Sequence, residues 1–322
     1  MNTLKILGTL LATLVLLGAG GFVWARGKSN EILDRRLDVH RVDFPVPFPL
    51  DPAEIERAGF TPAQSDSAAL ARAMERGRHL VDSRFACTEC HGEDFGGGVM
   101  VDDPMIGTLL GPNITSGAGG RVVSYTPSDW DRIVRHGLLP DGRPGAMPAQ
   151  DFQGMSDQEL SDIVVLIRSA PPVDAEVEAP TLGPLGTVLM ATGQIVLAYD
   201  EITDHERGHA TLPPVTEASA EFGAHLATVC TGCHKADLSG GKVGGGDPSW
   251  PAAANLTPVP GAFGDWTYQQ FVTAMTEGTR PDGRALVAPM DAVVGYTSNM
   301  TETERQALWA YLRSIPAQAT EG

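Results

Sequence analysis

The chain has 322 residues and a formal net charge of −17, with 40 acidic side chains against 23 Lys and Arg. This length leaves room for two domains of roughly 100 to 150 residues. The negative charge would repel a phosphate backbone, so we expect no nucleic-acid partner. Aromatic residues make up only 6% of the chain, while glycine (37) and proline (24) are frequent. Much of each domain is therefore expected to be loop packed around something other than aromatic side chains.

An uncharged stretch of 20 residues runs from Ile6 to Ala25. As a helix it would be about 30 Å long, enough to cross a bilayer core. Residues 1–25 are therefore predicted to be a membrane anchor or a signal segment, and Val23 with Ala25 offers a cleavage pattern. The flank beyond this stretch is basic, with Arg26, Lys28, Arg35 and Arg36. By the positive-inside rule this flank would stay in the cytoplasm, whereas the cofactor chemistry described below requires the opposite side.

Two further segments lie outside the expected domains. Residues 26–69 contain Val42–Leu50, in which apolar residues alternate with proline. Proline there disfavours a helix and predicts an extended tether. Residues 173–216 contain an apolar run from Leu185 to Ala198 that is too short to span a membrane. We expect this second segment to be a strap packed across the interface between the domains.

All four cysteines lie in two C-x-x-C-H motifs, Cys87–His91 and Cys230–His234. This spacing lets two thiols add to the vinyl groups of one haem while the adjacent imidazole reaches the iron. A zinc site usually places its C-x-x-C knuckles ~15–20 residues apart, but Cys230 lies 143 positions after Cys87. A thioredoxin-like pair would follow a strand in a βαβ unit, and neither motif does. We therefore predict two covalently bound haem c groups, attached through Cys87, Cys90, His91, Cys230, Cys233 and His234.

The two halves of the chain form an internal repeat. In each copy a Gly-x-His-Leu sequence precedes the motif, a Pro-Asp-Gly-Arg turn follows it, and a methionine comes 56 residues after the haem histidine. Each copy then ends in an apolar helix that begins with a capping box. The repeated residues are Gly77 and Gly223, His79 and His225, Arg143 and Arg284, Met147 and Met290, Ser156 with Glu159, and Thr301 with Glu304.

With these motifs both halves resemble class I cytochrome c domains, and the whole chain is similar to bacterial membrane-associated di-haem cytochromes c. The resemblance covers residues 70–172 and 217–317. It implies an all-α fold of two tandem domains, each with one covalently bound haem, behind an N-terminal transmembrane or signal helix. It also implies a close crossing of the first and last helix of each domain at Gly77 and Gly223.

The same resemblance implies iron ligands on both sides of each haem, with His91 and His234 proximal and Met147 and Met290 distal. A soft thioether on a Pro/Gly-rich loop can fill the sixth site and favour reduced iron. Met147 is followed by proline, as is usual in the family, whereas Met290 is followed by aspartate. The competing methionines have structural explanations, either beside a helix cap or too close to the motif: Met155, Met300, Met100 and Met105.

Other histidines could in principle bind metal. His79 and His225 lie on helices before the motifs, where a helix-surface or capping role is expected. His136 has a glutamate at the equivalent position of the second copy, so it is not expected to be a shared ligand. His205 and His209 are four residues apart and could share a helix face as a metal pair, but a solvent-exposed stretch is the more common situation.

The repeated arginines and aromatic residues are candidates for contact with the haems. Arg143 and Arg284 occupy equivalent turns, where a guanidinium could pair bidentately with a haem propionate or simply lie at the turn surface. The aromatic residues are expected to pack around the haem pockets rather than to relay electrons: Tyr125, Trp130, Trp266 and Phe271.

The predicted function is electron transfer, without catalytic residues. Both irons are expected to be saturated, and the chain has no Ser-His-Asp set, P-loop or dinucleotide glycine motif. It would serve as an anchored carrier or as the haem subunit of a larger complex in a respiratory or photosynthetic chain. An acidic surface favours a redox partner with a basic docking surface: a dehydrogenase, an oxidase, a reaction centre or another cytochrome. The alternative is an enzyme resembling di-haem cytochrome c peroxidases, in which one iron opens to bind peroxide.

Haem is attached outside the cytoplasmic membrane. We therefore expect the chain in the bacterial cytoplasmic membrane with its haem domains facing the periplasm, or free in the periplasm if the N-terminal segment is cleaved.

Overall fold

The computed structural model describes residues 2–244, 246–247 and 249–320. The α-helices are α1 (Asn2–Asp34), α2 (Pro52–Ala58), α3 (Pro62–Leu80), α4 (Cys87–His91), α5 (Pro127–His136), α6 (Asp157–Ser169), α7 (Pro184–Ala191), α8 (Ala198–Glu201), α9 (Ala220–Leu226), α10 (Thr231–His234), α11 (Tyr268–Glu277), α12 (Met290–Thr297) and α13 (Glu302–Ser314). Short turns of 3-10 or π-helix are η1 (Val81–Phe85), η2 (Ala149–Asp151), η3 (Ala227–Cys230) and η4 (Phe263–Asp265).

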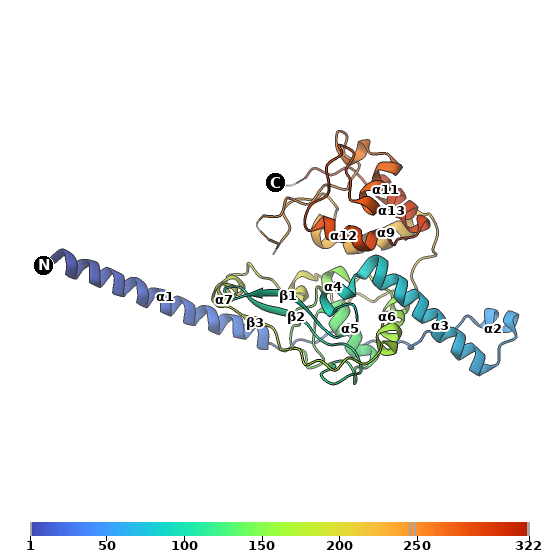
Figure 1. Cartoon of the computed structure of the whole chain (residues 1–322), viewed down its shortest axis with the longest axis horizontal. Helices are drawn as coiled ribbons and strands as arrows, with labels where there is room; N and C mark the ends of the chain where they lie inside the picture. Colours follow the sequence, from blue (N-terminus) through green and yellow to red (C-terminus); the bar gives the residue numbers. More distant parts are fainter. Residues whose placement is uncertain (1, 245, 248, 321–322) are drawn as a thin grey trace.

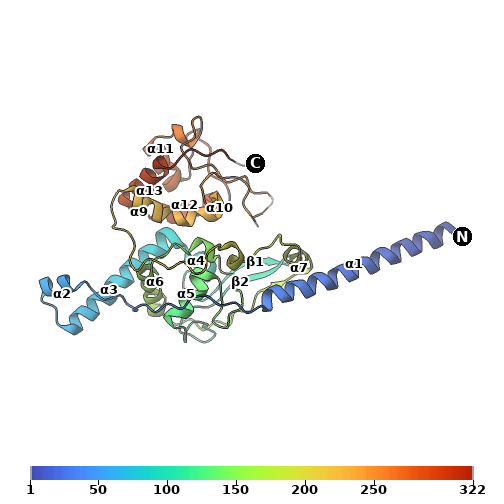
Figure 2. The same ribbon diagram turned by 180° about the vertical axis from the view of Figure 1, so that it is seen from behind.

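The molecule has three parts. The N-terminal part of α1 projects from one side, as both Figure 1 and the view from behind in Figure 2 show. A first domain contains α3 to α6, and a second domain, with α9 to α13, lies against one face of it (Figure 1). The mostly helical architecture of two repeated units behind an apolar N-terminal helix is as predicted.

In each domain the helix before the motif packs on the last helix, α3 on α6 and α9 on α13. A Cβ atom on Gly77 would lie 2.3 Å from the carbonyl oxygen of Asp162. A Cβ atom on Gly223 would lie 1.9 Å from the carbonyl oxygen of Ala307. Only glycine allows the two backbones to approach this closely. The crossing expected at these two glycines is therefore present in both domains.

Both last helices begin with the predicted capping boxes. The backbone N–H of Glu159 donates to Ser156 Oγ (3.3 Å), and the N–H of Ser156 donates back to Glu159 Oε2 (2.8 Å). Thr301 and Glu304 form the same reciprocal pair. These bonds satisfy backbone donors that the first turn of a helix otherwise leaves unpaired. They also fix where each last helix starts relative to the loop before it.

The purely α-helical expectation was incomplete, because the first domain also holds a small antiparallel sheet. β1 (Gly98–Asp103) pairs with β2 (Gly107–Gly111), and β2 pairs with β3 (Thr181–Leu182). Gly111 explains how the sheet fits against the motif, since a Cβ atom there would lie 1.7 Å from the carbonyl oxygen of Cys90. The sheet thus packs directly against α4.

The segment expected to be an extended tether, residues 26–69, is partly helical, and its part before α2 is packed on the first domain. α1 continues to Asp34, and prolines start both α2 and α3, where their missing N–H has no cost. Residues 35–51 do lack helix and strand, but Phe44 and Phe48 are only 4% and 8% exposed, in the core of the first domain. Burying each phenylalanine is worth roughly 1.5–3 kcal/mol, which a free tether would forgo.

The connector between the domains also differs from the expected strap. Its apolar run forms α7, which packs along α1, and Ser29 of α1 donates a hydrogen bond to the carbonyl oxygen of Thr187 (2.8 Å). Gly186 permits this position, because a Cβ atom there would lie 2.0 Å from the carbonyl oxygen of Ile106. The run from Leu185 to Ala198 therefore holds α1 on the first domain instead of crossing the domain interface.

Substituting Gly223→Ala should lower the free energy of unfolding by about 1–3 kcal/mol, because the added methyl must push α9 away from α13. Gly27→Ala is the matched control, since nothing lies within 4 Å of its Cβ position in α1. Urea unfolding followed by circular dichroism measures both. Equal stability of the two variants would contradict the close crossing.

Candidate haem sites

The first C-x-x-C-H motif forms α4, and the second begins at Cys230, the last residue of η3, and continues through α10. None of the four cysteines is in a disulfide. Burial raises the pKa of Cys87 to about 12 and that of Cys230 to about 11. Each motif thus places two cysteines and a histidine within five consecutive residues of helical structure.

The two motif histidines have the same tautomer. Nδ1–H of His91 donates to the carbonyl oxygen of Pro112 (2.9 Å), and Nδ1–H of His234 donates to that of Ala254 (2.7 Å). A carbonyl can only accept, so Nε2 keeps its lone pair in both rings. Burial lowers the pKa of both histidines. Neutral imidazoles oriented by a backbone carbonyl are the form that binds metal.

The two predicted distal methionines lie in different local structures. Met147 is half-buried in the loop before η2 and packs on the same core as Cys87. Met290 is half-buried and is the first residue of α12. Met155 and Met300 are 3% and 7% exposed in the two cores, which agrees with their expected packing role. Ligation of iron by Met147 and Met290 stays a prediction.

The aromatic residues pack as expected, and one of them leaves a polar atom without a partner. Trp130 is 4% exposed and meets Tyr125 edge to face at 5.7 Å. Its buried Nε1 has no hydrogen-bond acceptor within residues 2–244, 246–247 and 249–320. In the second domain Phe271 is buried and Trp266 packs beside it in the core. A haem carboxylate is an acceptor of the kind that Trp130 lacks, so the first pocket fits the group.

The two repeated arginines lie at the surface of their turns. Arg143 Nε donates to Asp141 Oδ2 (2.8 Å), and Arg284 Nε donates to Asp282 Oδ2 (2.8 Å). Their side chains are 44% and 71% exposed. Each guanidinium is thus engaged by its own turn, and pairing with a propionate stays a prediction.

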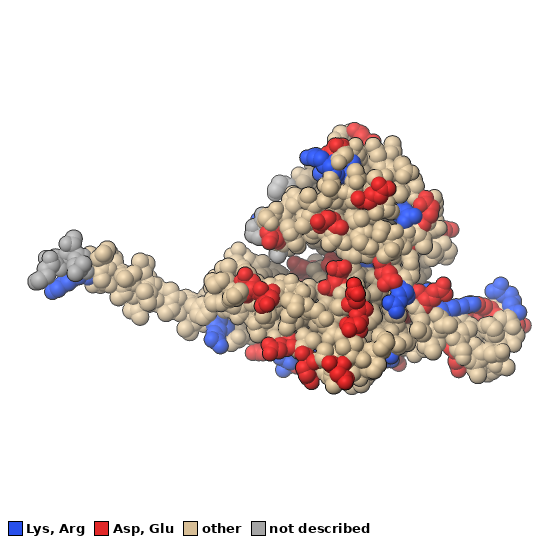
Figure 3. Space-filling view, in the orientation of Figure 1, with Lys and Arg blue, Asp and Glu red and all other residues tan. Residues whose placement is uncertain are grey.

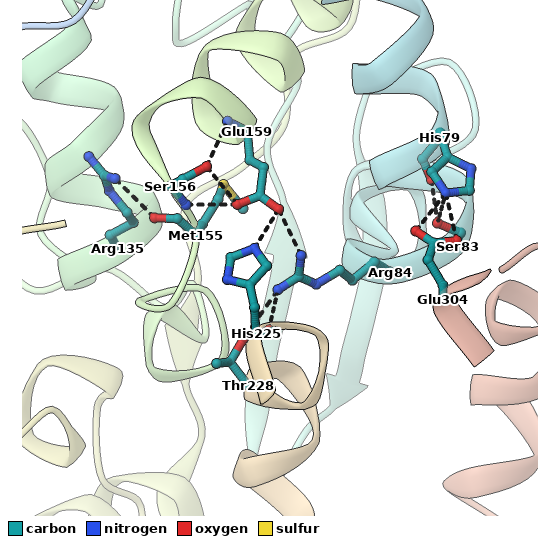
Figure 4. Close-up of polar contacts among 10 residues, drawn as sticks. All are labelled: His79, Ser83, Arg84, Arg135, Met155, Ser156, Glu159, His225, Thr228 and Glu304. Carbon is teal, nitrogen blue, oxygen red and sulfur yellow. Dashed lines mark hydrogen bonds and ion pairs between the residues drawn. The ribbon is translucent and has the colours of Figure 1, made fainter. Parts of the chain in front are cut away.

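A buried ion pair of the first domain, Arg84 with Glu159, contacts the second domain beside the motifs (Figure 4). Arg84 Nη1 donates to Glu159 Oε1 (2.8 Å), and Arg84 Nη2 donates to the carbonyl oxygen of His225 (2.6 Å) and to Thr228 Oγ1 (3.3 Å). His225 Nε2 lies 2.8 Å from the same Glu159 oxygen. Burial alone would raise the pKa of Glu159, but Arg84 and His225 outweigh it and lower that pKa to about 2. The carboxylate is therefore ionised and shared between the domains.

A second, equivalent contact lies on the other side of this interface (Figure 4). His79 Nε2 of α3 is 2.8 Å from Glu304 Oε1 of α13, and this hydrogen bond raises the pKa of His79. The sequence predicted that His79 and His225 are surface or capping residues of their own helices, and this prediction is wrong. Each instead binds the capping-box glutamate of the opposite domain. No pattern within one repeat could show this contact.

The same interface brings the two haem motifs together. Arg84 lies three residues before Cys87, and Thr228 lies two residues before Cys230. A Cβ atom on Gly232, inside the second motif, would lie 2.0 Å from Asp151 Oδ1 in η2 of the first domain. The second motif thus packs against the loop that carries Met147.

His205 and His209 are partly buried within a mostly exposed stretch, and they do not share a helix face. The chain from 202 to 219 contains no helix, and both residues are partly buried against the first domain. His136 lies beside them, with its Nδ1 3.0 Å from Nδ1 of His205. This group lies outside the two C-x-x-C-H motifs.

Two protein families match the chain, one in each domain. Residues 72–167 match the family described as cytochrome C oxidase, cbb3-type, subunit III, and residues 220–316 match the family described as cytochrome c. These matches confirm the two cytochrome c domains and, with the C-x-x-C pairs, the two covalent haem c groups.

Similar curated proteins include dehydrogenase subunits. The chain is 25% identical over 293 residues to the fructose dehydrogenase cytochrome subunit of Gluconobacter japonicus, and 27% identical over 278 residues to the alcohol dehydrogenase (quinone) cytochrome c subunit of Gluconobacter oxydans. These alignments cover 81% and 80% of this chain but only 56% and 57% of the relatives. A diheme cytochrome c-type protein of Cereibacter sphaeroides is 26% identical, over 66% of this chain and 73% of its own length.

Arg84→Met should lower the free energy of unfolding by about 3–5 kcal/mol, because it leaves the Glu159 carboxylate buried without its main partner. The double variant Arg84→Met with Glu159→Gln should recover a large part of this loss, since Gln still completes the capping box without a charge. Urea unfolding of the haem-loaded chain measures both. A single variant as stable as the parent would show that the pair does not hold the interface.

Proposed function

We propose that this chain, which carries two cytochrome c domains, transfers electrons as the haem subunit of a membrane dehydrogenase complex. The observation that carries the proposal is the meeting of the two haem motifs at one buried interface, through Arg84, Thr228 and Gly232. The names of the fructose and alcohol dehydrogenase subunits support a dehydrogenase as the electron donor. An anchored carrier outside such a complex would use the same two sites.

The residues of each domain have distinct roles in this function. Bound haem supplies one-electron redox chemistry at its iron. The cysteines fix its position covalently, and His91 and His234 offer neutral Nε2 donors whose tautomer a carbonyl oxygen fixes. Met147 and Met290 would close the opposite face, which favours the reduced state and leaves no position for a substrate. The Arg84–Glu159 interface would hold the two sites in a constant relation for transfer between them.

The proposed location is the cytoplasmic membrane, with both haem domains in the periplasm. Within Lys5–Asp34 of α1, an 18-residue window has a mean hydropathy of 2.2, and the helix is long enough to span a bilayer. The basic flank argues for the other orientation, but two of its residues are paired within the fold. Lys28 pairs with Glu31 (3.0 Å), and Arg35 pairs with Asp200. The attachment of haem outside the cytoplasmic membrane is the stronger argument for the periplasmic side.

A spectroelectrochemical titration of the purified protein, repeated with carbon monoxide and with peroxide, tests the function. Two reversible one-electron steps without ligand uptake are expected of an electron carrier. Binding of peroxide with turnover at one haem would instead identify an enzyme resembling the di-haem peroxidases.

Met147→Ala should lower the reduction potential of the first haem and let its reduced iron bind carbon monoxide, and Met290→Ala should do the same for the second haem. Met155→Leu is the control, because Met155 is buried in the core and a similar volume keeps the packing. The titration assigns each change. An unchanged potential in either alanine variant would mean that another residue is the sixth ligand.

The protein partner is expected to dock through basic residues. The chain carries a net charge of −17, and acidic side chains are spread over both domains on the face shown in Figure 3. Electrostatic steering raises the association rate and weakens as salt screens it. Stopped-flow reduction by a basic redox protein should therefore slow by about tenfold or more between low and physiological ionic strength. A rate independent of salt would exclude this mode of docking.

A further inference from the structure

Four histidines from three separated parts of the chain meet beside α5. His40 lies in the segment after α1, His136 is the last residue of α5, and His205 and His209 lie in the connector between the domains. One ring nitrogen from each of His40, His136 and His209 lies within 4.8 Å of the other two. His136 is fully buried, and the side chain of His209 is 4% exposed. The group is therefore partly buried, with His136 at its most enclosed point.

The hydrogen bonds around the group fix the tautomers of His40 and His209. Nδ1–H of His40 donates to the carbonyl oxygen of His205 (2.8 Å), and Nδ1–H of His209 donates to that of Gln153 (3.1 Å). Since a carbonyl oxygen can only accept, Nδ1 carries the proton in both neutral rings. Nε2 of each ring is therefore an unprotonated nitrogen with a free lone pair.

The tautomer of His136 follows from its neighbour. His205 donates through Nε2–H to the carbonyl oxygen of Tyr199 (2.9 Å), so Nδ1 of a neutral His205 can only accept. That atom lies 3.0 Å from Nδ1 of His136, which must therefore be the donor. Nε2 of His136 is then unprotonated as well. All three rings therefore have an unprotonated Nε2.

These three unprotonated Nε2 atoms face one another without a hydrogen-bond donor between them. Nε2 of His136 and Nε2 of His209 are 3.3 Å apart, and buried Nε2 of His40 has no hydrogen-bond partner within the described part of the chain. The carboxylate of fully buried Asp131 lies 3.6 Å from Nε2 of both His136 and His209. Facing lone pairs and a carboxylate repel each other, and a cation between them would remove that repulsion.

The surrounding charge favours a metal ion, because Asp131 and Asp157 share one guanidinium, that of Arg135, at 2.7 and 2.9 Å. This trio leaves one net negative charge beside three neutral imidazoles.

We propose that His40, His136 and His209 bind one Zn²⁺ ion through their Nε2 atoms, with Asp131 or a water as the fourth ligand. Nitrogens bound tetrahedrally to zinc at ~2.0–2.1 Å lie about 3.3 Å apart, the separation found between His136 and His209. A hydrogen bond from each Nδ1 to a fixed acceptor is the usual support of zinc-bound histidine. The ion would tie the segment after α1 and the connector to α5.

The test uses the full haem-loaded chain, purified in detergent without a histidine tag and stripped with a chelator. Equilibrium dialysis against Zn²⁺ alone, read by elemental analysis, should give one saturable zinc per two haem irons. Zinc-edge X-ray absorption should show nitrogen or oxygen neighbours at ~2.0–2.1 Å with imidazole scattering. Thermal unfolding should shift upward when zinc is added. Absence of saturable binding, or bound zinc without imidazole scattering, would overturn the site.

Matched variants locate the ion. His40→Gln and His209→Gln should each weaken zinc binding at least tenfold and remove the zinc-dependent thermal shift, while both haems are incorporated normally. His79→Gln is the control, because His79 binds Glu304 at the domain interface, and its zinc affinity should equal that of the parent. If the His40 and His209 variants bind zinc as the control does, the ion lies elsewhere and the proposal is wrong.

Discussion

One buried carboxylate, that of Glu159, connects three parts of the molecule. Its Oε2 caps α6, while its Oε1 binds Arg84 beside the first haem motif and His225 of the second domain. Removing a charge from water is expensive, and only several good hydrogen bonds at once offset that cost. Arg84 and His225 can both reach Oε1 only when the two domains are docked. The arrangement of the motifs therefore depends on this single group being fully bonded.

The interface follows from the internal repeat. His225 of the second domain binds the capping glutamate of the first, and His79 of the first binds Glu304, the capping glutamate of the second. Such reciprocal contacts are typical of a two-fold symmetric dimer, here formed within one chain. Arg84 breaks the symmetry, because the equivalent residue, three positions before the second motif, is Ala227. One half of the interface is thus a buried ion pair and the other a simple histidine–carboxylate contact.

Local features of the fold could be predicted from the sequence, and distant contacts could not. Gly77, Gly223 and both capping boxes lie within one repeat, so alignment of the copies identified them. A further capping box, Thr61 with Gln64 at the start of α3, was available in the sequence as a helix signal within the supposed tether. Phe44 and Phe48 were equally visible, and their size argues against a free segment. The histidine group was not accessible in this way, since His40 and His209 are 169 positions apart and only the fold brings them together.

The continuity of α1 has a consequence for how the molecule meets its partners. The helix runs without interruption to Asp34, and Ser29 is fixed to α7 of the connector, which packs on the first domain, so α1 has no swivel between the apolar stretch and the haem domains. Residues 26–34 add roughly 13 Å of rigid helix beyond the apolar stretch. In a bilayer the chain would therefore carry its haems at a constant height and tilt. Encounters would become a search in two dimensions, in which a neighbour at the same height has a high effective concentration and one at another height has almost none.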